Sequence, residues 1–88
     1  MRLIRYTSQY KKDFRRLKKS NKDINKLNGI IALLLDEEPL YIHCRDHALI
    51  GNWAGYRECH IESDWLLIYS INEVELVLVR TGSHSELF

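Results

Sequence analysis

Three short apolar segments in the C-terminal part constrain the fold more than any other feature of this 88-residue sequence. They are the runs Tyr56–Ile61, Trp65–Ile71 and Val74–Thr81, which are joined by residues 62–64 and 72–73. Connections this short make consecutive strands antiparallel neighbours in a sheet. The middle run, WLLIYSI, is apolar on both faces, so we expect it to form the central strand.

Two amphipathic helical segments precede these strands. Ser8 fits the N-cap of a first helix that ends at about Lys19. Asn21 or Asp23 fits the cap of a second helix that ends at about Leu35. The short connection between the two helices predicts an antiparallel helical hairpin. The faces that we expect to be buried repeat at helical spacing: Tyr10, Phe14 and Leu17 in the first helix, and Ile24, Leu27, Ile30, Ile31 and Leu34 in the second.

A strand from Met1 to Tyr6 completes the element order β-α-α-β-β-β, with a short C-terminal tail or helix after it. This order predicts a single α+β domain over residues 1–88, in which an antiparallel sheet carries an N-terminal two-helix hairpin packed on one face. The opposite face of the sheet is then left open for function. No apolar run approaches the roughly 20 residues that cross a bilayer, and the N-terminus lacks the apolar core of a signal peptide. We therefore expect a cytoplasmic protein with no membrane partner.

Basic residues are concentrated in the N-terminal part of the sequence. Residues 1–28 contain ten basic and two acidic residues, whereas residues 29–88 contain three basic and ten acidic residues. Such an asymmetry suggests a polyanion as partner for the basic part. A solvated helical face has the same pattern, so charge alone gives nucleic-acid binding only modest support. The candidate phosphate-binding residues lie on the outer arc of the first helix: Lys11, Lys12, Arg15, Arg16, Lys18 and Lys19.

Three histidines after residue 45 are candidates for proton transfer. Strand alternation places Glu58 and His60 on one face and Cys59 on the other, core-facing side, so His60 lies on the open face of the sheet. His47 lies in the loop before the sheet, and His84 follows the last strand. Each of them is also explained as a surface or hydrogen-bonded histidine without any catalytic role.

RNA cleavage without a metal needs a base for the ribose 2′-OH, an acid for the leaving 5′-oxygen and a cation beside the phosphate. Histidine suits both proton transfers, because its unperturbed pKa is about 6.5. Arg80 suits the third role through its planar fork of donors, and Asp46 or Asp64 can orient a histidine or act as the base. The aromatic residues leave two interpretations open: Trp65 fits the core better than a base-stacking platform, while Phe88 either stacks on a nucleobase or pins the tail to the sheet.

Cys44 and Cys59 stay reduced in a cytosolic protein, and neighbouring histidines raise the question of zinc. No paired cysteine or histidine spacing supports a structural zinc site. We therefore predict no metal and no cofactor.

The stretch DHALIGNWAGYRECHIESDWLLIY, followed by RTGSHSELF, resembles the YafQ branch of the RelE-like toxins, which belong to the RelE/ParE superfamily of bacterial toxin–antitoxin systems. The resemblance covers residues 46–88 closely and implies a RelE-like fold. It also implies a metal-independent endoribonuclease that cleaves mRNA in the A site of the 70S ribosome and is neutralised by a cognate antitoxin. The active-site positions that it implies are His47, His60, Asp64, Trp65, Arg80, His84 and Phe88.

The resemblance leaves open which histidine is the base, and two stretches depart from the family pattern. Ser63 stands where a proline is common, and residues 41–45 differ from other members. Three other functions are weighed against the toxin: an RNA-binding module without catalysis, a partner-binding subunit that uses the open sheet face, and a metal protein. The toxin is the interpretation that the motif favours.

Overall fold

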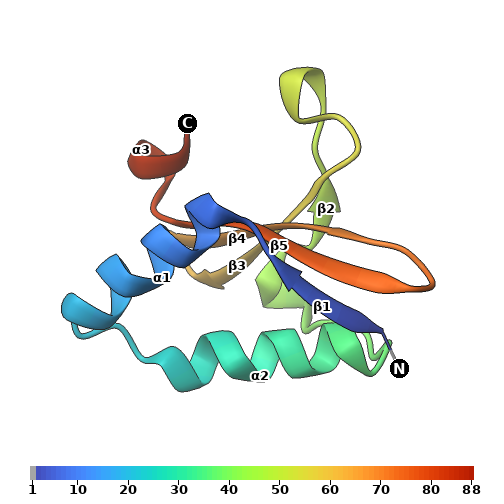
Figure 1. The fold of residues 1–88 in the computed structure, drawn as a ribbon, viewed down its shortest axis with the longest axis horizontal. Coiled ribbons are helices and arrows are strands. Elements are labelled where there is room, and N and C mark those ends of the chain that lie inside the picture. The colour runs from blue at the N-terminus through green and yellow to red at the C-terminus, as the bar shows by residue number, and fades with distance from the viewer. Residues whose placement is uncertain (1) are drawn as a thin grey trace.

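The computed structural model describes residues 2–88 as a five-stranded sheet with helices on both of its faces (Figure 1). Met1, where the expected first strand begins, lies outside the described residues. The elements, with η denoting a 3-10 helix, are β1 (Leu3–Tyr6), α1 (Ser8–Lys19), α2 (Ile24–Leu35), η1 (Ile42–Cys44), β2 (His47–Ala48), η2 (Gly51–Trp53), β3 (Arg57–Glu62), β4 (Trp65–Ile71), β5 (Glu75–Gly82) and α3 (His84–Leu87).

The sheet confirms the predicted run of antiparallel strands and corrects the prediction at its two edges. The strand order is β1-β5-β4-β3-β2, with β4 at the centre and antiparallel to both neighbours. The sheet is mixed rather than antiparallel throughout, because β1 pairs with β5 in parallel, from Leu3 opposite Glu75 to Tyr6 opposite Leu78. The connection between β1 and β5 contains α1, α2 and the other three strands, so it permits either direction, and a four-residue strand carries no pattern that distinguishes the two. His47, expected in a loop, lies in the short edge strand β2.

Side chains at the helix starts fix where each helix begins. Thr7, and not Ser8, caps α1: its Oγ1 accepts a hydrogen bond from the Tyr10 amide at 3.0 Å. The same hydroxyl donates to the carbonyl of Val79 at 2.7 Å, so the start of α1 is tied directly to β5. Asp23 caps α2 by accepting from the Asn25 amide at 3.0 Å. In Figure 1, α1 and α2 meet at a short joint and run back in opposite directions.

The main core lies between these two helices and the sheet. Leu27, Trp65, Leu67 and Leu78 are fully buried there, with Cys59 on the same side as predicted. Of the described helices, none is long and apolar enough to cross a membrane.

The opposite face, expected to be open, is partly covered. Leu66 and Ile68 of the central strand are buried under Leu87 of α3, with Trp53 and Tyr56 packed at the edge of this second cluster. On the neighbouring strand β3, the side chain of His60 on this face keeps only 13% of its surface exposed.

Candidate active site

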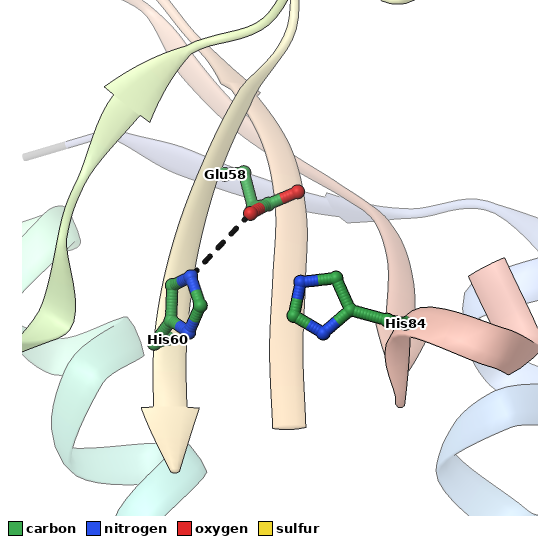
Figure 2. Close-up of side chains that lie close together, drawn as sticks. All are labelled: Glu58, His60 and His84. Carbon is green, nitrogen blue, oxygen red and sulfur yellow. Dashed lines mark ion pairs between the residues drawn. The ribbon is translucent and has the colours of Figure 1, made fainter. Parts of the chain in front are cut away.

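Two imidazoles and a buried carboxylate converge on the face of the sheet opposite α2 (Figure 2). Alternation along β3 places Glu58 and His60 on the same face, and the turn after β5 brings His84, the first residue of α3, toward them. The ring centroids of His60 and His84 are 5.8 Å apart. The His60 Nε2 atom lies 3.6 Å from Oε1 of Glu58, and the Glu58 side chain is only 7% exposed.

Asp64 holds His84 from the turn between β3 and β4. Its Oδ1 accepts from the His84 amide at 3.0 Å and lies 2.9 Å from Nδ1 of the same residue. These contacts lower the pKa of Asp64, first through the backbone N–H and then through the imidazole. Because Nδ1 is engaged by the carboxylate, Nε2 of His84 is the ring nitrogen left for chemistry.

His47 reaches the same carboxylate from the neighbouring edge strand. It pairs with Glu58 across the β2–β3 ladder, and its Nε2 lies 3.7 Å from Oε1 of Glu58. Nδ1 of His47 contacts the carbonyl of Arg45, which requires that nitrogen to carry the proton. Three of the predicted residues, His47, His60 and His84, are thus brought around one acid.

Glu58 is the residue that sequence reasoning did not select for the site. Its signal was an acidic residue two positions before His60 in an otherwise half-buried strand, where alternation puts both side chains on one face. A buried carboxylate is costly unless it is paired with donors or cations, so its position between His47 and His60 points to a role there.

Arg80 stands in the same cross-strand row as Glu58, with Ile68 of β4 between them, and is bound to a different acid. Its Nε and Nη2 donate to Asp13 of α1 at 2.7 and 3.2 Å. The hydrogen bonds with Asp13 raise the pKa of Arg80 above its already high ordinary value. Within residues 2–88, no hydrogen bond or ion pair joins Arg80 to His60 or His84.

The aromatic candidates divide into one buried and one exposed residue. Trp65 is 0% exposed and donates from Nε1 to Thr81 at 2.9 Å, so it lies in the core, which is the interpretation that the sequence favoured over a base-stacking platform. Phe88 is 57% exposed, and its ring packs edge-on against Trp53 at 5.8 Å and lies 6.5 Å from the ring of His84. Trp53, the last residue of η2, thus supports Phe88, a role that the sequence did not indicate.

The basic side chains of α1 form an exposed arc, and one of them, Arg16, forms ion pairs. Arg16 is part of an ion-pair network, because its Nη2 lies 3.3 Å from Asp13 and its Nε 2.9 Å from Glu86 of α3. The other five predicted phosphate-binding residues are exposed, and none of them forms an ion pair in the described part of the chain: Lys11, Lys12, Arg15, Lys18 and Lys19.

A metal ion fits the central group of side chains better than it fits the cysteines. One ligand atom each from Glu58, His60 and His84 lie within 4.8 Å of one another. Two imidazoles and a carboxylate suit zinc or copper, with Asp64 orienting His84 from behind. Cys44 and Cys59 are buried in the main core, where burial raises the pKa of both thiols.

Comparisons with known proteins agree on one family. A profile of the family described as "Bacterial toxin of type II toxin-antitoxin system, YafQ" matches residues 2–88. The mRNA interferase toxin YafQ of Escherichia coli K12 is 44% identical over 86 residues, which are 97% of this chain and 94% of that protein.

Solved structures give the same result. The crystal structure of the E. coli DinJ–YafQ complex contains a chain with 42% identity and a TM-score of 0.93, and the match covers 100% of this chain and 99% of that one. A metal-bound toxin from Helicobacter pylori has 41% identity and a TM-score of 0.93, and both chains are covered completely.

Proposed function

The chain belongs to the YafQ family of toxins of bacterial type II toxin–antitoxin systems, and we propose that it cleaves mRNA in the A site of the ribosome. The family and its named relatives make it an mRNA interferase, that is, an endoribonuclease, with a cognate antitoxin as its protein partner. The observation that carries the proposed chemistry is the pair of imidazoles, His60 and His84, 5.8 Å apart across a shared carboxylate.

In the proposed reaction, one of these two imidazoles takes the proton from the ribose 2′-OH. The 2′-oxygen then attacks phosphorus, and the bond to the 5′-oxygen breaks. The other imidazole gives its proton to that leaving oxygen, so the products are a 2′,3′-cyclic phosphate and a 5′-OH end. Each proton transfer contributes roughly 10²–10⁴-fold to the rate.

The remaining residues of the site have supporting roles in this proposal. Asp64 orients His84 through Nδ1, and Glu58 orients His60 and His47 from between them. Arg80 offsets the charge that develops on the phosphate. Phe88 offers an exposed ring on which a base of the codon stacks.

The exposed lysines and arginine of α1 bind phosphates of ribosomal RNA or mRNA in this proposal. The ribosome supplies the positioning of the substrate that a small protein lacks, because an ordered codon places the scissile phosphate for attack. No metal takes part in these steps.

The test is to map RNA 5′ ends in a purified translation system programmed with a defined mRNA. The wild-type chain is expected to cut within codons that occupy the A site and to leave 5′-OH ends. His84→Gln is expected to lower the cleavage rate at least 100-fold, about the size of one acid–base contribution. His43→Gln, at an exposed histidine that stacks on Tyr41 and forms no ion pair with Glu58 or Asp64 among residues 2–88, is the matched control.

Three outcomes would reject parts of this proposal. Full activity of a folded His84→Gln variant would exclude His84 from catalysis. Equal cleavage of the same RNA without ribosomes would exclude ribosome dependence. Binding of RNA with no new ends would favour the module without catalysis.

A further inference from the structure

Asp13 is a fully buried carboxylate in the middle of the basic helix α1. It is the only acidic residue of that helix, and it is 0% exposed. Both of its oxygens are engaged: Oδ2 accepts from Arg80 Nε at 2.7 Å and from the Thr81 amide at 3.2 Å. Oδ1 accepts from Arg80 Nη2 at 3.2 Å and from Arg16 Nη2 at 3.3 Å.

Attachment of α1 to the sheet does not require this charge. Tyr10 and Leu17, one turn to either side, are already buried in the main core. A buried ion pair is often no more stabilising than apolar side chains of the same volume. A carboxylate at this place therefore does two things that an apolar residue would not do: it accepts from the buried Thr81 amide, and it fixes the direction of a guanidinium.

The contact with Arg80 has the geometry needed for that purpose. Two adjacent nitrogens of the guanidinium fork, Nε and Nη2, face the two oxygens of Asp13. A two-point contact of this kind fixes the plane of the guanidinium as well as its position. Nη1 makes no hydrogen bond among the described residues, and the Arg80 side chain keeps 20% of its surface exposed.

Asp13 is itself held in place by two groups that connect it to β5 and to α3. The backbone amide of Thr81, next to Arg80 on β5, fixes one oxygen. Arg16 fixes the other and continues at 2.9 Å to Glu86 of α3, the helix that begins with His84. The carboxylate therefore lies where α1, β5 and α3 meet.

We propose that Asp13 is a positioning residue for RNA cleavage, which acts by holding the Arg80 guanidinium so that Nη1 is presented to the scissile phosphate. The inference rests on the proposed function, because it needs Arg80 to meet the phosphate. Asp13 itself does not touch the RNA. Loss of its charge lowers the rate of the chemical step and leaves binding of the programmed ribosome unchanged.

The experiment is a double-mutant cycle of Asp13→Asn and Arg80→Ala, with single-turnover cleavage on programmed ribosomes. Asp13→Asn alone is expected to lower the maximal rate about 10- to 100-fold, the scale on which a misplacement of about 1 Å acts, while half-saturation stays within about twofold. In the Arg80→Ala background the same substitution is expected to change the rate less than about twofold, because its target is gone. Asp23→Asn, the exposed cap of α2, is the matched control.

Two further measurements keep the test decisive if Asp13→Asn folds poorly. Asp13→Glu keeps the charge but lengthens the side chain by one methylene, so a folded variant is expected to lose about tenfold in rate. The Arg80 Nε–H proton, followed by NMR in the isolated chain, is expected to be protected from solvent exchange in the wild type and exposed in the Asp13 variants.

Each outcome separates the inference from the function on which it rests. Equal rate losses in both backgrounds, or a folded Asp13→Glu variant with the wild-type rate, would overturn the role of Asp13 and leave the endoribonuclease intact. Absence of cleavage by the wild-type chain would instead reject the proposed function itself.

Discussion

An imidazole transfers a proton only through a ring nitrogen that is not already engaged. At His84 this condition is met, because Asp64 occupies Nδ1 and leaves Nε2 directed at Glu58 and His60 (Figure 2). At His47 the carbonyl of Arg45 does the same for Nδ1. Two different acceptors therefore fix two imidazoles in the tautomer that exposes Nε2 to one carboxylate.

The contact between Asp64 and His84 gives a prediction for acid pH. The pKa of Asp64 is lowered from its ordinary value of 3.8, so its ionised form is the one that the fold stabilises. The contribution of this contact to the stability of the fold is therefore complete above pH 3.8. It is lost as the pH falls through the lower pKa that Asp64 has in the folded chain. The amide proton of His84, followed by NMR, is expected to titrate with a midpoint below 3.8. Asp64→Asn is expected to remove this step, and a midpoint at or above 3.8 would contradict the assignment.

A metal ion that binds between Glu58, His60 and His84 should inhibit this enzyme, because it would take the lone pairs that the proposed acid–base chemistry uses. Addition of Cu²⁺ or Zn²⁺ is expected to abolish cleavage at occupancy of one ion per chain, and a chelator is expected to restore it. Isothermal titration gives the stoichiometry independently of activity. Glu58→Gln should weaken the affinity about 10-fold or more, whereas His43→Gln should not change it. Stoichiometric binding without loss of cleavage would contradict this prediction.

At the scale of elements, the site depends on how α3 is joined to the end of β5. Gly82 stands at this junction with φ of +157°, and a Cβ there would lie 2.9 Å from Glu86 Oε1 and 3.1 Å from Arg16 Nη2. The capping box of Ser83 and Glu86 then starts α3 with His84 as its first residue. The position of the catalytic candidate is thus set by a glycine and a cap rather than by the sheet itself.

Gly82→Ala is expected to destabilise the chain by about 1–3 kcal/mol, since it adds backbone strain and separates Arg16 from Glu86. Urea unfolding measures that loss. Because α3 shifts with Glu86, cleavage at a temperature where the variant is folded is also expected to fall. Gly29→Ala on α2, where an added Cβ meets nothing within 4 Å, is the control and should not lower the stability. Wild-type stability of Gly82→Ala would show that the junction tolerates a side chain.

The elements also show which parts of the fold a single sequence can predict. The antiparallel pairing of β3, β4 and β5 was predictable because short turns place consecutive strands side by side. The buried face of β3 was predictable from the alternation of side chains, which puts Cys59 on the core side. The parallel pairing of β1 was not, because direction after a long connection leaves no trace in four residues. Helix periodicity likewise found Tyr10 and Leu17 but gave no reason to expect the charge of Asp13 between them to be buried.

The candidate site could be predicted only in part, for the same reason. His60 and His84 came from strand alternation and from the family motif, and their proximity required β5 to return beside β4. The sequence shows Glu58 two positions before His60. It does not show that His47 lies opposite Glu58, because that position follows from the β2–β3 pairing. The partner of Arg80 lies 67 positions away on α1, a distance over which spacing in one sequence carries no information.

At the scale of the whole molecule, the uneven distribution of charge along the sequence places basic residues and the imidazoles on different surfaces. The basic residues of α1 that are free of ion pairs among residues 2–88 lie along one exposed arc, while the imidazoles lie beside the acidic residues Glu58 and Asp64. An excess of basic residues in the helical part attracts RNA over the screening length of about 10 Å at 0.1 M salt. The face that carries the imidazoles lacks this excess, so in the proposed reaction the basic arc of α1 brings the phosphate to it.

This division predicts that binding to ribosomes and cleavage can be separated by mutation. Lys12→Glu together with Arg15→Glu is expected to weaken ribosome association and to make the slope of log affinity against log salt shallower by about one unit for each phosphate that the variant no longer binds. Arg5→Glu on β1, an exposed residue outside α1, is compared with Lys12→Glu alone as the control for one charge reversal elsewhere on the surface, although it also removes the contact of Arg5 with Glu75 at 3.5 Å. Co-sedimentation with ribosomes at several salt concentrations measures the slope, and cleavage at saturating toxin measures the chemical step. The α1 variant should recover its rate at saturation, because the imidazoles are unchanged; an unaltered salt slope would mean that α1 does not contact RNA phosphates.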